Sequence, residues 1–525
     1  MKIINNLNFK FLFISSFLVF SLYCLYTLGL SYDQVYHIEN GERRLRYLFS
    51  LGLSDYYDIL HLRYYPGLYD TVSALISSVF PRKFYYEGFS IINFIFGLSG
   101  LFGLKKVVKF FFGNKVSTYF FIITLFSPLF FGHLFINPKD TIIATANFWI
   151  IYYVIKYLNN NNDISRKNTV IKIGFFLGLG VGVRIMFLGT LIPVIVFFLF
   201  EIFSKKIIQK KITFKDYFFD FLTVLLLAYL LMIICWPNVH SNIFYEPFSL
   251  FYSSLLDFSQ GVQASYFLGK FYNTDDTPWY YLLANFFYKI PVYIIISFFF
   301  YFIFFKQIKN FFLSNTNFFY FSNICFLLLV LPILISIFFQ LKMHDGVRYF
   351  LYLIPLINIF PSIFLNFLFS DISKIYKKIL IVFLSPFFLI FIYKFITITP
   401  YHYTYLNLFN DFTQKNNSFE NDYWGTSLKI LLKKFSRKID DENYIRIAHC
   451  GVNPNNVKFY LKKNGIKNYN LVHLNDDYDY VILINRAIAE TAKNERLTCF
   501  SKFKGKKSFV SIKKGSIELS KIIKN

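Results

Sequence analysis

Long apolar runs separated by short charged segments constrain this chain more than any other feature. A run of about 20 apolar residues is long enough to cross the hydrocarbon core of a bilayer as a helix. The first run, residues 11–30, follows Lys2 and Lys10, is too long for the core of a signal peptide and lacks a small-residue cleavage pattern. It is therefore interpreted as the first spanning helix, with its N-terminus in the cytoplasm.

The runs predict about eleven transmembrane helices. Lys and Arg are more frequent in the loops that this path places inside than in the short outer loops, which supports an N-terminus in the cytoplasm and a C-terminus outside. The predicted spans are residues 11–30, 88–104, 117–131, 142–155, 173–183, 186–203, 217–235, 291–305, 318–341, 349–369 and 379–396.

The composition agrees with a polytopic membrane protein. Of the 525 residues 55% are hydrophobic and only 16% are charged, which is outside the range of ordinary soluble domains. The net charge of +25 resides mostly in short loops and in the last part of the chain, so it fits a positive-inside topology and an anionic lipid surface better than nucleic acid. We therefore expect an integral membrane protein, of a bacterial plasma membrane, that binds no nucleic acid.

Three segments are predicted to lie outside the membrane. Residues 31–87 and 238–290 form large outer loops, the first with helices along the interface. From residue 401 charges become frequent, so residues 1–400 are assigned to the membrane domain and residues 401–525 to a small extracytoplasmic α/β domain. Cys450 and Cys499 can pair if that domain is outside the cytoplasm. The domain is predicted to contain strands at 444–449, 469–474 and 480–485 and helices at 454–463 and 486–493.

A polar island interrupts the apolar runs at residues 131–144, which read FGHLFINPKDTIIA. A charge at bilayer depth costs about 2.5 to 3.5 kcal/mol, so Lys139 and Asp140 must lie at a membrane surface or in a wet cavity. The plain alternative is a polar turn in which Asn137 and Pro138 break one helix and the charged pair is solvated.

The proposed topology places the charged and polar residues that could act in catalysis on one face, the non-cytoplasmic one. Transfer of a sugar from a lipid phosphate needs a base for the acceptor's proton and cations for the departing phosphate. Simpler readings remain open: Arg43, Arg44 and Arg46 as lipid-headgroup contacts, His37 as a hydrogen-bonded loop histidine, Glu39 and Glu42 as a solvated helix face. The residues on this face are Asp33, His37, Glu39, Glu42, Arg63, Asp70, Lys139, Asp140, Arg184, Asp345 and Arg348.

Four features follow one another along the membrane part: an acidic residue just after the first helix, RYYPGLYD in the same loop, FFGHLFINPKD, and DGVRYFLYLIP late in the membrane part. Together they resemble the GT-C superfamily, most of all the bacterial relatives of the protein O-mannosyltransferases and the lipid A aminoarabinose transferases. The NPKD block is the most specific of these features. The segment DYWGTSLK at residues 422–429 is also similar to bacterial members.

The resemblance implies an inverting transfer from a polyprenyl-phosphate-linked sugar on the non-cytoplasmic face. It assigns Asp33 as the catalytic base and Asp140 as its acidic partner. Lys139, Arg63 and Arg348 are expected to hold the donor phosphate. His37, Arg184 and Asn137 are further substrate-binding candidates.

A divalent cation, Mg²⁺ or Mn²⁺, is a possible cofactor, with Asp33, Asp140 and Glu39 as candidate ligands. Relatives often carry Asp-Glu where this chain has Asp33 and Gln34, which removes one carboxylate and weakens the case for a metal in the first loop. Glu39 is the candidate substitute.

The predicted activity is that of a membrane glycosyltransferase whose acceptor is a lipid-linked glycan or a protein. A transporter or lipid flippase is the alternative, but its polar residues should lie near helix midpoints and its halves should repeat, and neither feature is visible. A third reading is a membrane scaffold that displays the C-terminal domain. The sequence contains no P-loop, GxGxxG, CxxC or HExxH motif, which argues against an ATPase, a nucleotide-binding fold and a zinc site.

Overall fold

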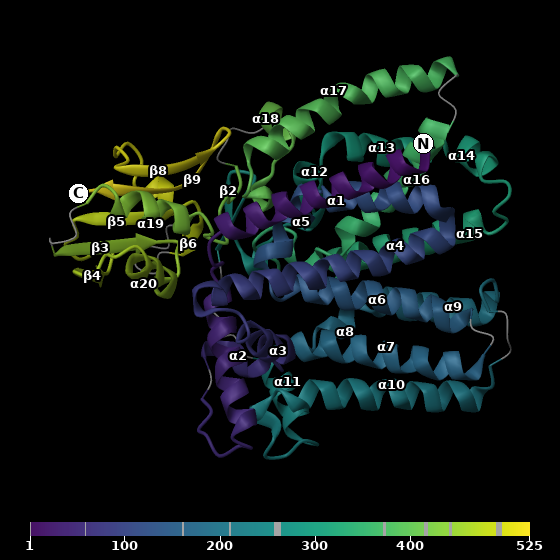
Figure 1. The fold of residues 1–525 in the computed structure, drawn as a ribbon, viewed down its shortest axis with the longest axis horizontal. Helices are drawn as coiled ribbons and strands as arrows, with labels where there is room; N and C mark the ends of the chain where they lie inside the picture. Colours follow the sequence, from purple (N-terminus) through teal and green to yellow (C-terminus); the bar gives the residue numbers. More distant parts are fainter. Residues whose placement is uncertain are drawn as a thin grey trace.

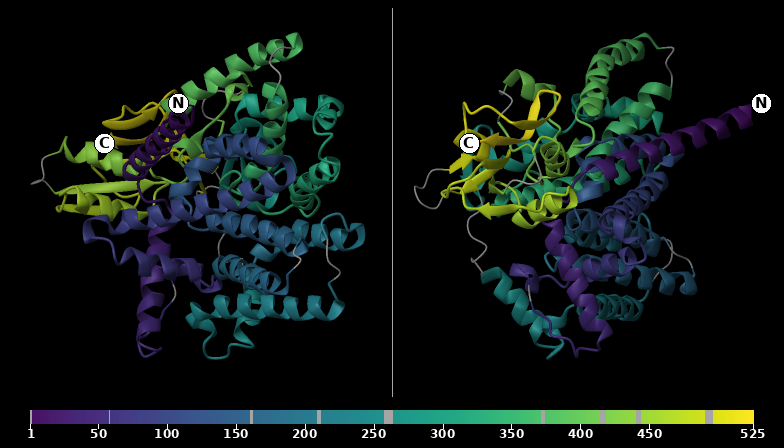
Figure 2. Two further views of the ribbon diagram at one scale, coloured as in Figure 1. Left: turned by 45° about the vertical axis from the view of Figure 1, so that its right-hand side comes forward. Right: turned by 60° about the vertical axis from the view of Figure 1, so that its left-hand side comes forward.

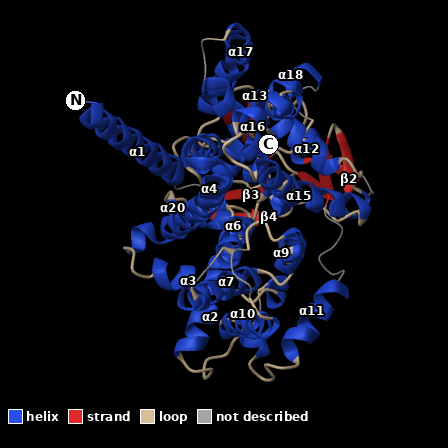
Figure 3. Cartoon of the chain, turned by 90° about the vertical axis from the view of Figure 1, so that its right-hand side faces the viewer, coloured by secondary structure: helices blue, strands red, loops and turns tan. Residues whose placement is uncertain are grey.

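A bundle of long helices carries a small β-sheet domain at one end (Figure 1). The structure is a computed structural model, and it describes residues 2–57, 59–159, 162–208, 212–256, 264–370, 374–413, 418–439, 444–489 and 496–525. Helices predominate throughout the bundle (Figure 3). The chain is thus a polytopic α-helical membrane protein with a C-terminal sheet domain, as the sequence predicts.

The bundle helices correspond closely to the predicted apolar runs. Their long axes run roughly parallel, and the N-terminal end of α1 extends beyond its neighbours (Figure 2). They are α1 (Lys2–Thr27), α4 (Tyr85–Leu125), α5 (Pro128–Ile136), α6 (Asp140–Leu158), α7 (Asp163–Val183), α8 (Phe187–Thr190), α9 (Ile192–Ser204), α10 (Phe214–Ile234), α13 (Val292–Ile303), α14 (Phe305–Phe311), α15 (Phe318–Phe338), α16 (Leu353–Ser370) and α17 (Ile375–Thr397).

Helix α4 folds back on itself at Gly113. This glycine has φ +85°, a conformation that other residues rarely adopt. The rings of Phe102 and Phe121 lie 4.8 Å apart, although 19 residues of straight helix would separate them by about 28 Å. The two arms of α4 therefore correspond to the second and third predicted spans.

The third predicted span ends earlier than expected. The predicted run 117–131 is wrong at its C-terminal end, because α4 stops at Leu125 and α5 begins separately at Pro128. Pro128 suits the first turn of a helix, where no N–H is needed, and it cannot continue the preceding helix without a break. Helix α5 then leads directly into the NPKD segment.

Among the described residues, six helices are long and apolar enough to cross a membrane. They are α4 with the short turn before it, α6, α10, α15, α16 and α17. Helix α12 (Tyr281–Lys289) and α13 pass this test together but are bent by 112°. The apolar part of α1 and helix α9 are shorter. The number of eleven spans stays a prediction.

The end of the bundle next to the sheet domain carries helices that run across it. Helix α2 (Gln34–Phe49) lies roughly perpendicular to the bundle helices (Figure 1). The first predicted loop thus contains helices, as expected. The other elements here are η1 (Leu60–Tyr64), α3 (Leu68–Ser77), α11 (Glu246–Leu256) and the hairpin β1 (Ala264–Phe267) and β2 (Lys270–Asn273).

The C-terminal domain is a five-stranded sheet with the order β4-β3-β5-β9-β8. Strands β3, β4 and β5 are parallel, whereas β9 is antiparallel to both β5 and β8. Helix α19 (Leu428–Ser436) packs against β8 and β9. The other elements are β3 (Ile445–Cys450), α20 (Pro454–Lys463), β4 (Tyr469–Val472), β5 (Tyr480–Ile484), β6 (Ala487–Ala489), β7 (Arg496–Thr498), α21 (Cys499–Lys502), β8 (Val510–Lys514) and β9 (Ile517–Lys524).

The α/β prediction for the C-terminal domain is largely confirmed. The three predicted strands and the helix at 454–463 are present. The helix predicted at 486–493 is wrong where the structure describes it, because β6 pairs with β7 there, and residues 490–493 lie outside the described residues. Cys450 and Cys499 form a disulfide. The domain boundary at residue 400 stays a prediction.

Candidate active site

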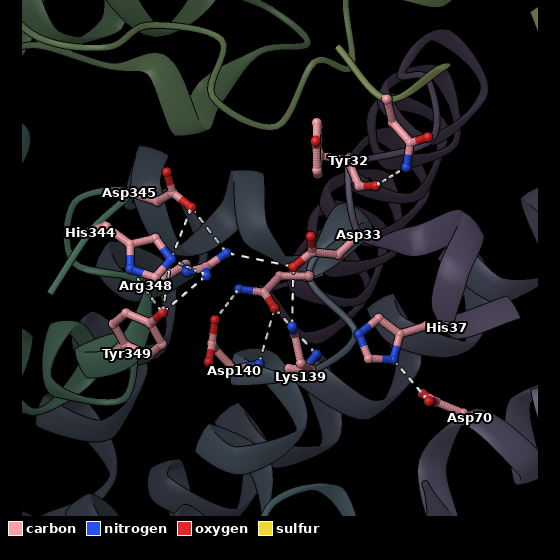
Figure 4. Close-up of polar contacts among 12 residues, drawn as sticks. Tyr32, Asp33, His37, Asp70, Lys139, Asp140, His344, Asp345, Arg348 and Tyr349 are labelled. Carbon is pink, nitrogen blue, oxygen red and sulfur yellow. Dashed lines mark hydrogen bonds and ion pairs between the residues drawn. The ribbon is translucent and has the colours of Figure 1, made fainter. Parts of the chain in front are cut away.

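Asp33 lies in the turn that joins α1 to α2, at the end of the bundle that faces the sheet domain. Its Oδ2 atom lies 3.1 Å from Nζ of Lys139 and 3.7 Å from Nη1 of Arg348 (Figure 4). Three segments that are far apart in the sequence therefore meet at one carboxylate. The Asp33 side chain keeps 26% of its surface exposed, so a substrate can approach it.

The NPKD segment holds Asp140 through its own asparagine. Asn137 ends α5, and its Oδ1 accepts hydrogen bonds from the backbone N–H groups of Lys139 and Asp140. Its amino group donates to Oδ2 of Asp140 at 2.8 Å. This arrangement is a side-chain mimic of a backbone turn, which asparagine favours. It buries Asn137 and Asp140 and leaves the Lys139 side chain directed at Asp33.

Arg348 is placed by the turn that precedes it. Asp345 and Gly346 have positive φ values of 55° and 73°, so the chain reverses sharply before η6 (Arg348–Phe350). The guanidinium then lies 3.1 Å from Oδ2 of Asp345 and donates to the ring of His344 and the hydroxyl of Tyr349. Its Nε is buried without a partner among the described residues. Arg348 thus keeps one donor for a ligand.

The charges at this cluster control one another. Burial acts to raise the pKa of Asp33, but the charges of Lys139 and Arg348 outweigh it and hold that pKa well below its usual range. Burial likewise acts to lower the pKa of Lys139, yet the carboxylate of Asp33 raises it overall. Asp33 is therefore ionised and Lys139 protonated at neutral pH.

Arg184 forms the side of the cluster nearest α7. It follows the last residue of α7, and its guanidinium faces the rings of Tyr65 and Tyr349 at 5.9 and 5.4 Å. The ring of Tyr65 also lies 5.6 Å from Nζ of Lys139. Arg184 makes no ion pair with a carboxylate among the described residues. Its charge is thus balanced by ring contacts, which an anion can supplement.

Arg44 holds the loop that carries Tyr65. Its side chain is fully buried and donates to the backbone carbonyls of Leu62, Tyr65, Pro66 and Cys235. A Cβ at Gly67 would collide with this guanidinium. The interpretation of Arg44 as a lipid-headgroup contact is therefore wrong. A cation with this many carbonyl partners is stable away from solvent.

The C-terminal region reaches the same cluster. Arg486 lies 3.8 Å from Oδ1 of Asp345 and 4.5 Å above the ring of Tyr32. The indole of Trp424 lies 5.3 Å from the guanidinium of Arg348. The sequence reasoning did not assign either residue to the site. The similarity of residues 422–429 to bacterial proteins was the one available signal for Trp424, and none pointed to Arg486.

The structure brings together most of the predicted site residues but not all of them. Asp33, Asn137, Lys139, Asp140, Arg184 and Arg348 are linked by the contacts above. His37 lies on α2, one turn after Asp33, and its Nδ1 instead pairs with Oδ2 of Asp70 at 2.8 Å. Arg63 is exposed, with its guanidinium on the hydroxyl and ring of Tyr64. The substrate-binding roles of His37 and Arg63 stay predictions.

The candidate metal ligands are not arranged as a metal site. Glu39 pairs with Arg43 at 2.5 Å, Asp33 faces two cations, and Asp140 accepts from an amide. No group of three or more His, Cys, Asp or Glu side chains that could hold a metal occurs in the described ranges. Mg²⁺ is often held by one or two carboxylates together with substrate phosphates and waters. The divalent-ion cofactor therefore stays a prediction.

An apolar cavity of about 580 Å³ lies away from this cluster, between α1, α4, α13, α16 and α17. Phe20, Phe126 and Phe395 line one part of it, and the rings of Phe20 and Phe395 also pack against Phe131 of α5. Among the described residues that line it, the polar side chains are those of Ser385, Tyr119 and Tyr293. It offers a place for hydrocarbon, not for a sugar or a phosphate.

Comparison with solved structures identifies the fold. ArnT from Cupriavidus metallidurans aligns in its apo state with 90% of this chain and 87% of its own, at a TM-score of 0.51 and 10% identity. The same protein bound to undecaprenyl phosphate aligns at a TM-score of 0.51 and 11% identity, over 89% of this chain and 86% of that protein. The apo oligosaccharyltransferase of Archaeoglobus fulgidus aligns at a TM-score of 0.45 and 10% identity, over 90% of this chain and 69% of that protein.

The chain thus shares the fold of ArnT, which agrees with the architecture that the resemblance to the GT-C superfamily implied. No protein-family model matches the chain, and no curated protein matches its sequence. The likeness is one of architecture, because the sequence identities are near 10%. What the site does has to be argued from its own residues.

Proposed function

We propose that this protein is a membrane glycosyltransferase that moves a sugar from a polyprenyl-phosphate donor to a hydroxyl or amine of a lipid-linked glycan or protein. One observation carries the proposal: a part-exposed carboxylate, Asp33, lies between Lys139 and Arg348 at the end of a GT-C bundle. The binding of undecaprenyl phosphate by ArnT, which shares the fold, supports a lipid phosphate as the donor carrier.

The transfer requires one displacement. The acceptor oxygen or nitrogen forms a bond to C1 of the sugar while the bond between C1 and the phosphate oxygen breaks. Asp33 takes the proton of the acceptor, and the phosphate retains the electrons of the broken bond. Lys139, Arg348 and Arg184 are placed to hold the negative charge that the leaving phosphate gains. A single displacement of this kind inverts the configuration at C1.

Donor binding and base activation are coupled in this arrangement. In the free protein Lys139 and Arg348 keep the pKa of Asp33 low, which makes it a weak base. A phosphate that binds these two cations offsets their charge at Asp33. Its pKa then moves toward the range of an effective general base. The donor is therefore expected to bind before the acceptor reacts.

The membrane orientation is part of the proposal. The Lys and Arg bias of the loops supports a cytoplasmic N-terminus and a site on the outer face. The Cys450–Cys499 disulfide adds support, because such bonds persist in oxidising compartments. The site then faces the periplasmic side of a bacterial plasma membrane, and lipid-linked donors and acceptors reach it there.

The proposal is tested by transfer from a panel of polyprenyl-phosphate sugars, with the protein in lipid nanodiscs and a membrane extract as acceptor source. Radiolabel that moves to a lipid or protein, with release of polyprenyl phosphate, supports the transferase. If no donor supports transfer and the lipid instead crosses vesicle membranes, the flippase alternative replaces it. Assays with and without EDTA decide the cation question, and activity that survives chelation removes the divalent-ion prediction.

A further inference from the structure

The segment of residues 420–427 lies between the helical bundle and the sheet domain. The carboxylate of Asp422 accepts hydrogen bonds from the backbone N–H groups of Thr426 and Ser427, each at 3.1 Å, and from the hydroxyl of Tyr403. Asp422 is fully buried, so these bonds fix a rigid turn before α19. The position of the next residue, Tyr423, is thereby set.

The same segment holds the turn that carries Asp33. The carbonyls of Trp424 and Thr426 accept the backbone N–H groups of Tyr32 and Gly29 at 2.8 and 3.0 Å. The C-terminal domain adds to this, because Asn453 donates to the carbonyl of Tyr32 at 2.8 Å. The loop before the proposed base is thus bonded to the C-terminal part of the chain.

Tyr423 begins a hydrogen-bonded path to the second carboxylate. Its hydroxyl lies 3.1 Å from Nε2 of His133, and Nδ1 of His133 lies 3.0 Å from the amino group of Asn137. That amino group donates to Asp140 at 2.8 Å. Tyr423, His133, Asn137 and Asp140 are all buried, so the path is shielded from water.

The path has one consistent assignment of protons. The Oδ1 atom of Asn137 accepts hydrogen bonds from the backbone N–H groups of Lys139 and Asp140, and these two bonds fix the orientation of its side-chain amide. Its amino group therefore faces His133 as well as Asp140, and Nδ1 of the histidine must accept. The proton of the neutral imidazole then resides on Nε2 and is donated to the oxygen of Tyr423. If Nδ1 of His133 instead carried the proton, two donors would face each other, and the Asn137 amide would have to flip. Its amino group could then no longer donate to Asp140.

We propose that Tyr423 is a positioning residue of the transfer site: it fixes the tautomer and orientation of His133 and, through Asn137, the orientation of Asp140. The inference rests on the proposed function. The C-terminal segment is then a permanent part of the active site, and it connects the loops of both carboxylates. It does not contact the reacting atoms itself.

A double-mutant cycle tests the inference. Tyr423→Phe is expected to lower kcat about tenfold and to change the donor KM less than about twofold, because the cations that bind the phosphate are untouched. In an Asn137→Ala background, where the path is already cut, Tyr423→Phe is expected to change kcat less than about twofold. Equal losses in both backgrounds would overturn the inference.

Tyr157→Phe is the matched control. It removes another buried tyrosine hydroxyl, one that donates to Asp220 at the end of the bundle away from the sheet domain and lies outside the path. It is expected to cost the same factor with and without Asn137→Ala. If Tyr423→Phe behaves in this way too, its role is structural.

The outcome also separates this inference from the proposed function. A wild-type protein that transfers no sugar from any donor would refute the function, and the path would then be judged from Tm values alone. Tm shifts of Tyr423→Phe and Asn137→Ala that overlap in the double variant support the path. Shifts that add would refute it. For the Tyr157→Phe control, the Tm shift is expected to add to that of Asn137→Ala.

Discussion

Asp33 and Glu201 are carboxylates at opposite ends of the bundle, and their surroundings differ in kind. Glu201 lies near the C-terminal end of α9, away from the sheet domain (Figure 1), and is fully buried. It accepts the N–H groups of Ile207 and Ile208 and the hydroxyls of Ser204 and Tyr320. Every oxygen of Glu201 is thus used by the protein itself.

The cluster at Asp33 is open where that at Glu201 is closed. Most partners of Glu201 are sequence neighbours at or just after the C-terminal end of α9. The partners of Asp33 come from distant loops, its side chain is partly exposed, and Arg348 beside it keeps a buried Nε without a partner in the described chain. Charges gathered from distant segments and left incomplete indicate a binding site, whereas locally satisfied charges indicate structure.

Replacement of the two carboxylates should separate activity from stability. Asp33→Asn is expected to lower transfer by about 10³-fold while expression and Tm stay near wild type, because the general base is lost and a part-exposed ion pair adds little stability. Glu201→Ala should lower Tm, because buried N–H groups lose their acceptor at about 1–3 kcal/mol each, and it should leave kcat per folded protein unchanged. Full activity of Asp33→Asn would remove the assignment.

Two arginines in ion pairs extend the comparison. Arg348→Met is expected to lower kcat by about 10²-fold, because a preorganised donor to the developing phosphate charge is lost. Arg166 pairs with Asp216 and Asp220 at the end of the bundle where α6 ends and α7 and α10 begin, and Arg166→Met should leave transfer within about twofold. Equal losses of kcat in the two variants would show that each ion pair supports activity only through folding.

Removal of Lys139 should change the pH profile of transfer. Burial raises the pKa of Asp33, whereas the charges of Lys139 and Arg348 lower it. Lys139→Met removes one of these charges and must therefore raise the pKa of Asp33. Because the base acts only when ionised, activity is lost as the pH falls through this pKa. The acid limb of kcat/KM should therefore move to higher pH in Lys139→Met. Lys463→Met, which removes an exposed partner of Glu87, is the control that should keep the wild-type profile.

Glu420 offers the smallest effect, on stability alone. Burial, with the charge of Asp345, raises its pKa to about 7, although Arg486 and Lys289 oppose this. A carboxyl with a raised folded-state pKa binds more protons when folded, so stability falls as the pH rises from about 4.5 to 7. Glu420→Gln should flatten this part of the Tm profile between pH 5 and 7. An unchanged slope would show that another group titrates there.

Sequence patterns predicted the bundle and the core of the site because both depend on strong local signals. Apolar runs located the helices, and the charges of Lys139 and Asp140 beside them were costly enough to indicate a wet site. The break before Pro128 was visible in the sequence but was outweighed by the continuous apolar run. The strand β6 was missed because its pairing with β7 lies in tertiary structure.

The contacts that complete the site were beyond any local pattern. Arg44 looks like a surface cation, and only the folded loop reveals the carbonyls that bury it. Tyr423 and Arg486 reach the cluster from the C-terminal region, hundreds of residues after Asp33 and Asp140. Periodicity and composition contain no information about such long-range partners.

The configuration of the product at C1 tests the central claim most directly. Wild-type protein in nanodiscs would receive a polyprenyl-phosphate sugar labelled with ¹³C at C1, and NMR would report the anomer of the donor and of the product. Direct attack by an acceptor deprotonated by Asp33 predicts complete inversion. Retention of configuration would contradict the account, because it requires a covalent sugar intermediate that the role assigned to Asp33 does not include.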